Sequence, residues 1–166
     1  MPFDKDGDIS PEILVSRYNA DLANELGNLF SRTTAMIVKY LGGDLPPAPY
    51  GEGRPLYGAI RAGLDGYAAH MERMEFSRAL AAWWPAIQQA NRFVEEMRPW
   101  DLAKDPDRRP ELEEVFRELW AVLATAGTVL LPFMPEKMQS MLDQLHAPPA
   151  ALDGLPRAEA GATGLV

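Results

Sequence analysis

The sequence contains no cysteine, which excludes structural disulfides and metal sites built from thiolates. Histidine is almost as scarce, because His70 and His146 are the only two. No apolar run approaches the roughly 20 residues that a membrane-spanning helix needs, and the acidic N-terminus is unlike a secretory signal. These absences predict a cytoplasmic protein without a membrane partner.

Positive charge is also in short supply. Lysine and arginine number 16 against 24 aspartates and glutamates, which gives a net charge of −8. A broad basic surface that would attract any nucleic acid is therefore excluded. An acidic chain can still bind a short RNA loop if stacking and contacts with base edges supply the specificity.

Hydrophobic residues make up 47% of the 166 positions, enough for one globular domain with a sizeable core. Apolar residues recur at three- and four-residue spacing, and we find no pattern of alternation that would favour a strand. The sequence predicts an all-α fold, an antiparallel bundle of about five helices. The expected helices span residues 11–41, 56–73, 75–97, 110–131 and 135–146.

Proline and glycine set the expected boundaries of these elements. Gly42 and Gly43 should end the first helix, and Pro85 should kink the third or split it at Trp84. Residues 44–55, rich in proline and glycine, are expected to form a loop. The helical bundle should cover residues 10–146, and residues 147–166 should form a flexible tail.

A polar stripe marks the first predicted helix. Asn24, Asn28 and Arg32 lie four residues apart, which places them in a row on one helical face. Trp100 follows the proline that ends the third helix. Amides and guanidinium groups bind base edges, and tryptophan stacks on unpaired bases, so the four residues are candidates for RNA recognition. Two structural alternatives stay open: a solvated helix face for the stripe, and a core plug for Trp100.

Two longer segments carry a resemblance to a known family. NADLANELGNLFSR and ANRFVEEMRPWDLAK resemble the C-terminal anticodon-binding helical domain of methionyl-tRNA synthetases, with Phe93 where that family has tyrosine. The opening PFDKDGDIS resembles the segment that precedes this domain, so the resemblance covers roughly residues 3–146. It implies that the partner is the CAU anticodon loop of tRNA(Met). Asn28 and Arg32 would then meet anticodon bases, Trp100 would stack on the anticodon, and Asn24 would contribute less.

The resemblance also implies that this chain lacks the catalytic part of the enzyme. Residues 1–9 would be the linker from a missing catalytic domain, which would be the second partner and would bind ATP and methionine. The chain has neither a His-x-Gly-His element nor a Lys-Met-Ser-Lys-Ser loop, so we expect no catalytic residues, no cofactor and no ligase activity of its own. Asp4, Asp6 and Asp8 lack the glycine spacing of a calcium loop, so we expect no metal site.

Two other interpretations of the whole chain remain open at this point. One is a helical module for protein interaction or packing that does not bind RNA. The other is the equivalent domain of another class I synthetase. Asn28, Arg32 and Trp100 together favour the methionine family over its relatives.

Overall fold

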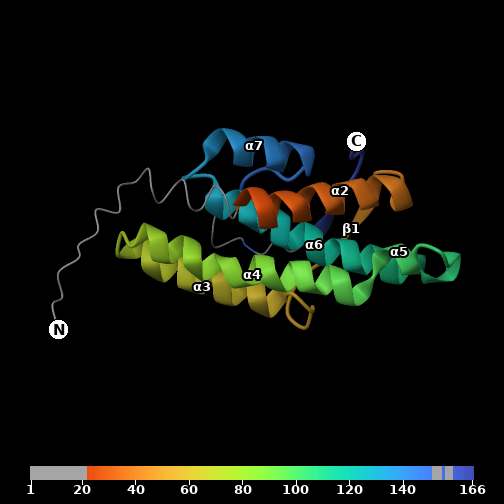
Figure 1. Cartoon of the computed structure of the whole chain (residues 1–166), viewed down its shortest axis with the longest axis horizontal. Helices are drawn as coiled ribbons and strands as arrows, with labels where there is room; N and C mark the ends of the chain where they lie inside the picture. The colour runs from red at the N-terminus through yellow and green to blue at the C-terminus, as the bar shows by residue number, and fades with distance from the viewer. Residues whose placement is uncertain (1–21, 151–154, 156–158) are drawn as a thin grey trace.

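The computed structural model describes residues 22–150, 155 and 159–166. These residues form a helical bundle with one small two-stranded sheet (Figure 1). The all-α prediction is confirmed for the bundle, and the sheet is an addition to it. The elements in chain order are η1 Leu22–Leu26, α2 Gly27–Leu41, β1 Leu45–Pro49, α3 Tyr57–Glu72, α4 Phe76–Met97, α5 Pro99–Leu102, η2 Pro106–Arg108, α6 Arg109–Leu130, α7 Pro135–Gln144 and β2 Glu159–Ala162.

Helices α3, α4, α6 and α7 match the predicted segments to within two residues at every boundary. Gly42 ends α2 in the left-handed conformation with φ of 70°, as the sequence predicts. The first nine residues and the predicted start of the first helix lie outside the described residues.

Pro85 does not split α4, contrary to one of the two outcomes expected from the sequence. Proline removes one backbone hydrogen bond to the carbonyl four residues earlier. Both Pro85 and Ala81, the residue that would have supplied that carbonyl, lie on the exposed side of the helix. Water can therefore satisfy the carbonyl group, and the helix continues.

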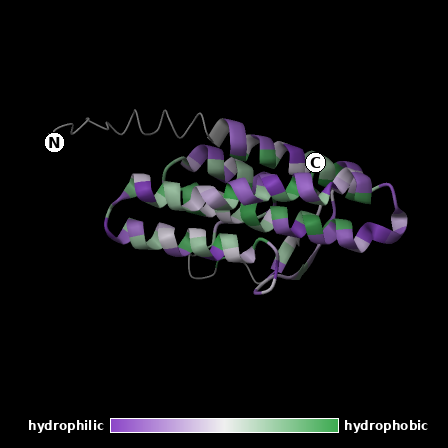
Figure 2. Ribbon diagram, turned by 60° about the horizontal axis from the view of Figure 1, so that its bottom comes forward, coloured by the Kyte–Doolittle hydropathy of each residue, from purple (hydrophilic) through white to green (hydrophobic). Residues whose placement is uncertain are grey.

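Helix α6 is the centre of the bundle. It contacts α2, α3, α4, α5, α7 and both strands, and every residue from 115 to 130 is buried. The sequence predicts one apolar face for this segment, but the structure covers all sides of it. The part of α6 from Leu119 to Leu130 contains no charged residue, as suits a helix covered on all sides. The outer helices carry hydrophilic and hydrophobic residues in turn along their ribbons (Figure 2).

Helices α3 and α4 form a close antiparallel hairpin (Figure 1). Two glycines of α3 make the close approach possible. A Cβ atom on Gly63 would lie 2.7 Å from Trp83 Cε3, and one on Gly66 would lie 2.9 Å from the Ala82 Cβ atom. These glycines weaken α3 as an isolated helix but let the Trp83 indole pack fully buried between the helices.

The prediction of a flexible tail over residues 147–166 is wrong for the part that the structure describes. Strand β2 pairs antiparallel with β1, with Ala48 opposite Ala160 and Leu45 opposite Ala162. Buried side chains accompany the pairing at Ala147, Leu155, Ala160, Ala162 and Leu165. The predicted loop 44–55 consequently contains a strand.

The prolines of β1 explain why the sequence pattern does not predict this strand. Strand β1 reads LPPAP, and proline cannot donate to a ladder, so a proline-rich segment argues against a strand. In the structure, arginines bind the carbonyl groups of two of these prolines: Arg117 donates to the Pro46 carbonyl at 3.1 and 3.0 Å, and Arg54 donates to the Pro49 carbonyl at 2.9 Å.

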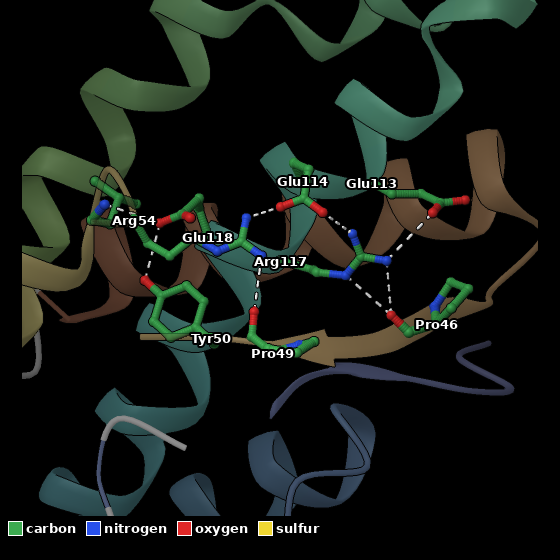
Figure 3. A network of polar contacts seen from close by, with 9 residues as sticks. Pro46, Pro49, Tyr50, Arg54, Glu113, Glu114, Arg117 and Glu118 are labelled. Carbon is green, nitrogen blue, oxygen red and sulfur yellow. Dashed lines mark hydrogen bonds and ion pairs between the residues drawn. The ribbon is translucent and has the colours of Figure 1, made fainter. Parts of the chain in front are cut away.

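These arginines belong to a polar network that ties the 44–55 segment to α6 (Figure 3). Arg54 and Arg117 both form ion pairs with Glu114. Behind them, the buried Glu118 carboxylate accepts hydrogen bonds from the Tyr50 hydroxyl at 3.0 Å and from the Leu56 backbone N–H at 2.9 Å. Burial raises the pKa of Glu118 and that of Tyr50. The network fixes Pro55 and Leu56, which form one wall of a surface hollow described below.

None of the described helices combines the length and the apolar composition that a bilayer crossing requires.

Candidate functional site

The predicted polar stripe spans two kinds of helix. Asn24 lies in the π-helical turn η1, whereas Asn28 and Arg32 lie in α2. A π-helical turn changes the angular spacing of a regular α-helix and is frequent at functional sites. The three side chains nevertheless line one surface groove, with Asn24 and Asn28 exposed.

Helix α4 supplies the opposite wall of this groove. The lining residues are Asn24, Glu25, Asn28 and Arg32 from η1 and α2, and Gln88, Asn91 and Arg92 from α4. The groove has a volume of about 530 Å³, which falls within the range of roughly 300–1,000 Å³ typical of ligand pockets. Nearly all of its lining groups are amides or guanidinium groups, a composition suited to a polar, planar ligand.

Arg32 connects three elements at this site. Its guanidinium group donates to the Glu95 carboxylate of α4 at 2.5 Å. The same group lies over the Trp100 ring of α5, 5.1 Å from the ring centroid, in a cation–π contact. The structure thus brings Arg32 and Trp100 together, as the sequence-based hypothesis requires, and Asn28 lines the adjoining groove.

A left-handed residue places Trp100. Helix α4 ends at Met97, Arg98 adopts φ of 49°, and Pro99 opens the short helix α5. Such a residue is a common way to end a helix and turn the chain. Asp101 then accepts hydrogen bonds from Arg98 at 2.6 Å and from Lys104 at 2.7 Å, and both bonds lower its pKa, that of Lys104 more strongly.

Trp100 differs from two other tryptophans of the chain. Trp83 and Trp120 are 0% and 3% exposed, so they are core residues. Trp100 packs against the core with part of its surface and leaves the rest accessible beside Arg32. Part of the Trp100 side chain is therefore accessible, whereas a fully buried core plug would have no accessible surface.

The charges around the groove are mixed. Arg32 is paired with Glu95, but no carboxylate in the described part of the chain pairs with Arg92, which is exposed. One carboxylate oxygen of Glu25 is buried and accepts no hydrogen bond from the described residues. The groove therefore offers donors from Arg92, acceptors from Glu25, and amides that can act as either.

A second hollow adjoins the first on the far side of α4. Gln88 and Arg92 line both hollows, so together they form the ridge between them. The second hollow has a volume of about 590 Å³, and its remaining lining residues are Pro55, Leu56, Pro85, Gln89, Phe93, Glu96 and Met97.

The sequence did not single out the contribution of α4. Gln88, Arg92 and Glu95 follow one another at four- and three-residue spacing, a polar stripe like that of the first helix. Asn91 is half-buried, and its amide donates to the Ile87 carbonyl at 3.1 Å. The polar stripe on α4 is visible in the sequence, but only the tertiary packing shows that it faces the same groove as the stripe on η1 and α2.

Known proteins resemble this chain in sequence and in fold. Methionine–tRNA ligase 1 of Bacillus anthracis is 40% identical over 157 residues, which covers 88% of this chain. The ligase of Bacillus subtilis is 39% identical over 148 residues. The free-state crystal structure of methionyl-tRNA synthetase from Mycobacterium tuberculosis superposes with a TM-score of 0.78 at 29% identity, over 95% of this chain and 33% of that one.

The chain is homologous to part of a methionine–tRNA ligase. It spans about a quarter of the length of the curated relatives that it matches: 24% of the B. anthracis ligase and 22% of the B. subtilis ligase. The resemblance seen in the sequence is thereby confirmed. No protein-family model matches the sequence.

Proposed function

We propose that this chain recognises the CAU anticodon of tRNA(Met), as the C-terminal anticodon-binding domain of a methionine–tRNA ligase. Its partners in this role are the anticodon loop and the catalytic domain of the ligase, both in the cytoplasm. The homology to methionine–tRNA ligases supports the general assignment. The observation that carries the anticodon assignment is the contact between Arg32 and the partly exposed Trp100 beside a groove lined by amides.

In the proposed complex, Trp100 and Arg32 form a stacking platform. Stacking of a base on an aromatic side chain is worth about 1–3 kcal/mol per base and tolerates any base. The platform would therefore supply affinity, and the amides beside it would supply the choice of base.

Base choice would come from Asn28, Asn24 and Glu25. The exposed amides can both donate to and accept from a base edge. Glu25 lines the groove, and one of its carboxylate oxygens has no hydrogen-bond partner among the described residues. Cytosine and adenine carry exocyclic amino groups that could donate to a carboxylate there. A wrong base would leave such a buried group unpaired, at a cost of about 1–3 kcal/mol.

The test is fluorescence anisotropy of a labelled CAU stem-loop titrated with the whole chain at low salt, beside stem-loops changed at single anticodon bases. We expect tighter binding to CAU than to the variants. Arg32→Gln and Trp100→Leu should each weaken binding roughly tenfold. Arg73→Gln, at an exposed arginine outside the groove, should leave binding nearly unchanged.

The packing alternative gives a different result. Trp100 also packs against the core, so Trp100→Leu would then lower the melting temperature without changing RNA affinity. If CAU and the altered loops bind equally, or if none binds, the anticodon assignment is wrong.

A further inference from the structure

The row formed by Gln88 and Arg92 on α4 separates the two hollows and belongs to both. The two residues are four positions apart on the exposed side of the helix, so their side chains lie one above the other, about 6 Å apart along the axis. The polar groove beside α2 and the hollow beside Pro55 and Leu56 are therefore neighbours on the two sides of this row.

Arg92 is unusual among the described arginines. The guanidinium groups of most of them pair with carboxylates: Arg32, Arg54, Arg61, Arg78, Arg98, Arg108, Arg109 and Arg117. Arg92 is exposed and pairs with no carboxylate of the described chain. The protein has a net charge of −8, so a guanidinium group beside a groove that forms no ion pair with the described residues is notable. Its planar arrangement of N–H donors matches the oxygens of a phosphate.

The lining of the second hollow contains apolar residues, whereas that of the first is polar. Phe93 and Met97 are half-buried members of its lining, and Pro55 and Pro85 are exposed apolar residues at its sides. An apolar, partly aromatic surface suits the flat face of a base. Glu96 lines the same hollow, and a carboxylate repels phosphate but accepts hydrogen bonds from the amino groups of bases.

We propose that the second hollow is a subsite for a loop nucleotide that flanks the anticodon. Arg92 binds the phosphate that joins this nucleotide to the anticodon, and Gln88 contacts the backbone beside it. The flanking base lies on Phe93 with its edge toward Glu96, so the subsite favours a base with an exocyclic amino group. This inference rests on the proposed anticodon function and adds residues from α4 to it.

The experiment measures binding of the CAU stem-loop to the whole chain as a function of salt, for the original protein, Arg92→Gln and Arg73→Gln. Arg73 is an exposed arginine just before α4, and no carboxylate of the described chain pairs with it, so it controls for the loss of one positive charge. It lies far from the ridge, since the 16 residues between the start of α4 and Arg92 span roughly 24 Å. We expect Arg92→Gln to weaken binding roughly five- to tenfold for every anticodon alike. The slope of log K against log salt should become shallower by about 0.7–1.

A second arm tests the base subsite. Stem-loops in which one flanking base at a time is replaced by an abasic residue are compared on the original protein and on Phe93→Leu, which keeps an apolar side chain without the ring. One abasic position should weaken binding to the original protein several-fold and have little further effect on Phe93→Leu. Melting temperatures of both variants show that the fold is retained.

The outcomes separate the two proposals. If Arg32→Gln and Trp100→Leu weaken binding while Arg92→Gln behaves as Arg73→Gln does, the anticodon site stands and the subsite is wrong. The same conclusion follows if abasic flanking positions affect the original protein and Phe93→Leu equally. If no stem-loop binds the original protein, the anticodon function itself fails, and the subsite fails with it.

Discussion

Arg32 contacts two neighbouring side chains at once, the Glu95 carboxylate and the Trp100 ring. The ion pair with Glu95 is exposed on both sides, with 39% and 61% of the two side chains accessible, and exposed pairs contribute only about 0–1 kcal/mol. The contact with Trp100 holds the guanidinium plane beside the groove. In the proposed complex, a base could therefore replace Glu95 as the partner of Arg32 at little cost, while the contact with Trp100 would keep Arg32 in place.

Removing the competing carboxylate should strengthen RNA binding. Glu95→Gln frees the Arg32 guanidinium group and removes one negative charge beside the groove, so we expect a two- to fivefold higher affinity for the CAU stem-loop, on the order of 0.5–1 kcal/mol. Anisotropy titrations at fixed salt measure the effect. Glu136→Gln, at an exposed glutamate of α7, is the matched control. A weaker complex with Glu95→Gln would mean that the ion pair positions Arg32 for binding.

Glu118 gives a pH-dependent prediction. Its pKa is raised by burial above the ordinary value of 4.5, so the folded state holds this proton more tightly than the unfolded state does. Its contribution to stability is therefore lost as the pH rises above 4.5 toward the folded-state pKa. Glutamine can keep both accepted hydrogen bonds without the charge. The stability of Glu118→Gln relative to the original protein should accordingly increase between pH 4 and pH 7.

Urea denaturation at the two pH values measures this change. Glu136→Gln again serves as the control for the loss of one carboxylate. If the stability difference between Glu118→Gln and the original protein is the same at both pH values, burial does not disfavour the charged Glu118 carboxylate.

Among the secondary-structure elements, the glycines of α3 show which features of a helix can be predicted from the sequence and which cannot. Helical periodicity fixes the bounds of α3 well, and propensity treats Gly58, Gly63 and Gly66 alike as weaknesses. The structure separates them: a Cβ atom on Gly58 would meet nothing within 4 Å, whereas one on Gly63 would meet the Trp83 ring at 2.7 Å. Local pattern predicts the helix, but only the packing of the neighbouring helix explains its composition.

The two glycines should respond to alanine in opposite directions. Gly58→Ala should stabilise the protein by about 0.5–1 kcal/mol, because it reduces the backbone freedom of the unfolded chain. Gly63→Ala should destabilise it by about 1–3 kcal/mol, because the indole or the helix must move. Free energies of unfolding from urea titrations measure both. Equal effects of the same sign would show that α3 and α4 do not approach each other as closely as described.

The same limit applies to the candidate site and to the strands. The stripe of α2 and the tryptophan after Pro99 are visible in the sequence, because helical spacing and a helix-ending proline are local signals. The matching stripe on α4 is visible too, but nothing local says that it faces α2. The sequence pattern does not reveal strand β1 because its prolines contradict the usual strand signals. Its contacts come in part from distant segments, namely pairing with β2 and the hydrogen bonds from Arg117 of α6 to the Pro46 carbonyl.

For the whole molecule, the end of the described chain is a structural component. Leu165 is 4% exposed, and its N–H donates to the Gly43 carbonyl at 3.0 Å. Its carbonyl group comes so close to Gly43 that a Cβ atom there would lie 2.3 Å from it. The described residues that follow α7 thus contribute to the hydrophobic core, with Leu165 packed beside the end of α2.

A pair of neighbouring substitutions tests this contribution. Leu165→Ala should lower the free energy of unfolding by about 1–3 kcal/mol, somewhat less than a central core leucine because the chain end can adjust. Val166→Ala, at a fully exposed residue, should change it by less than about 0.5 kcal/mol. Chemical denaturation followed by circular dichroism provides both values. Equal stability of the two variants would support the flexible tail that composition alone predicts.

The pairing of β1 with β2 also has a consequence during synthesis. The Gly164 N–H donates to the Asp44 carboxylate across 120 positions of the chain, and a nascent chain leaves the ribosome with its N-terminal part first. Strand β1 therefore has no partner strand until residues 159–162 have emerged. The wall of the second hollow at Pro55 and Leu56 depends instead on the hydrogen bonds of Tyr50 and Leu56 to Glu118 of α6, so it can form before the β1–β2 sheet is complete.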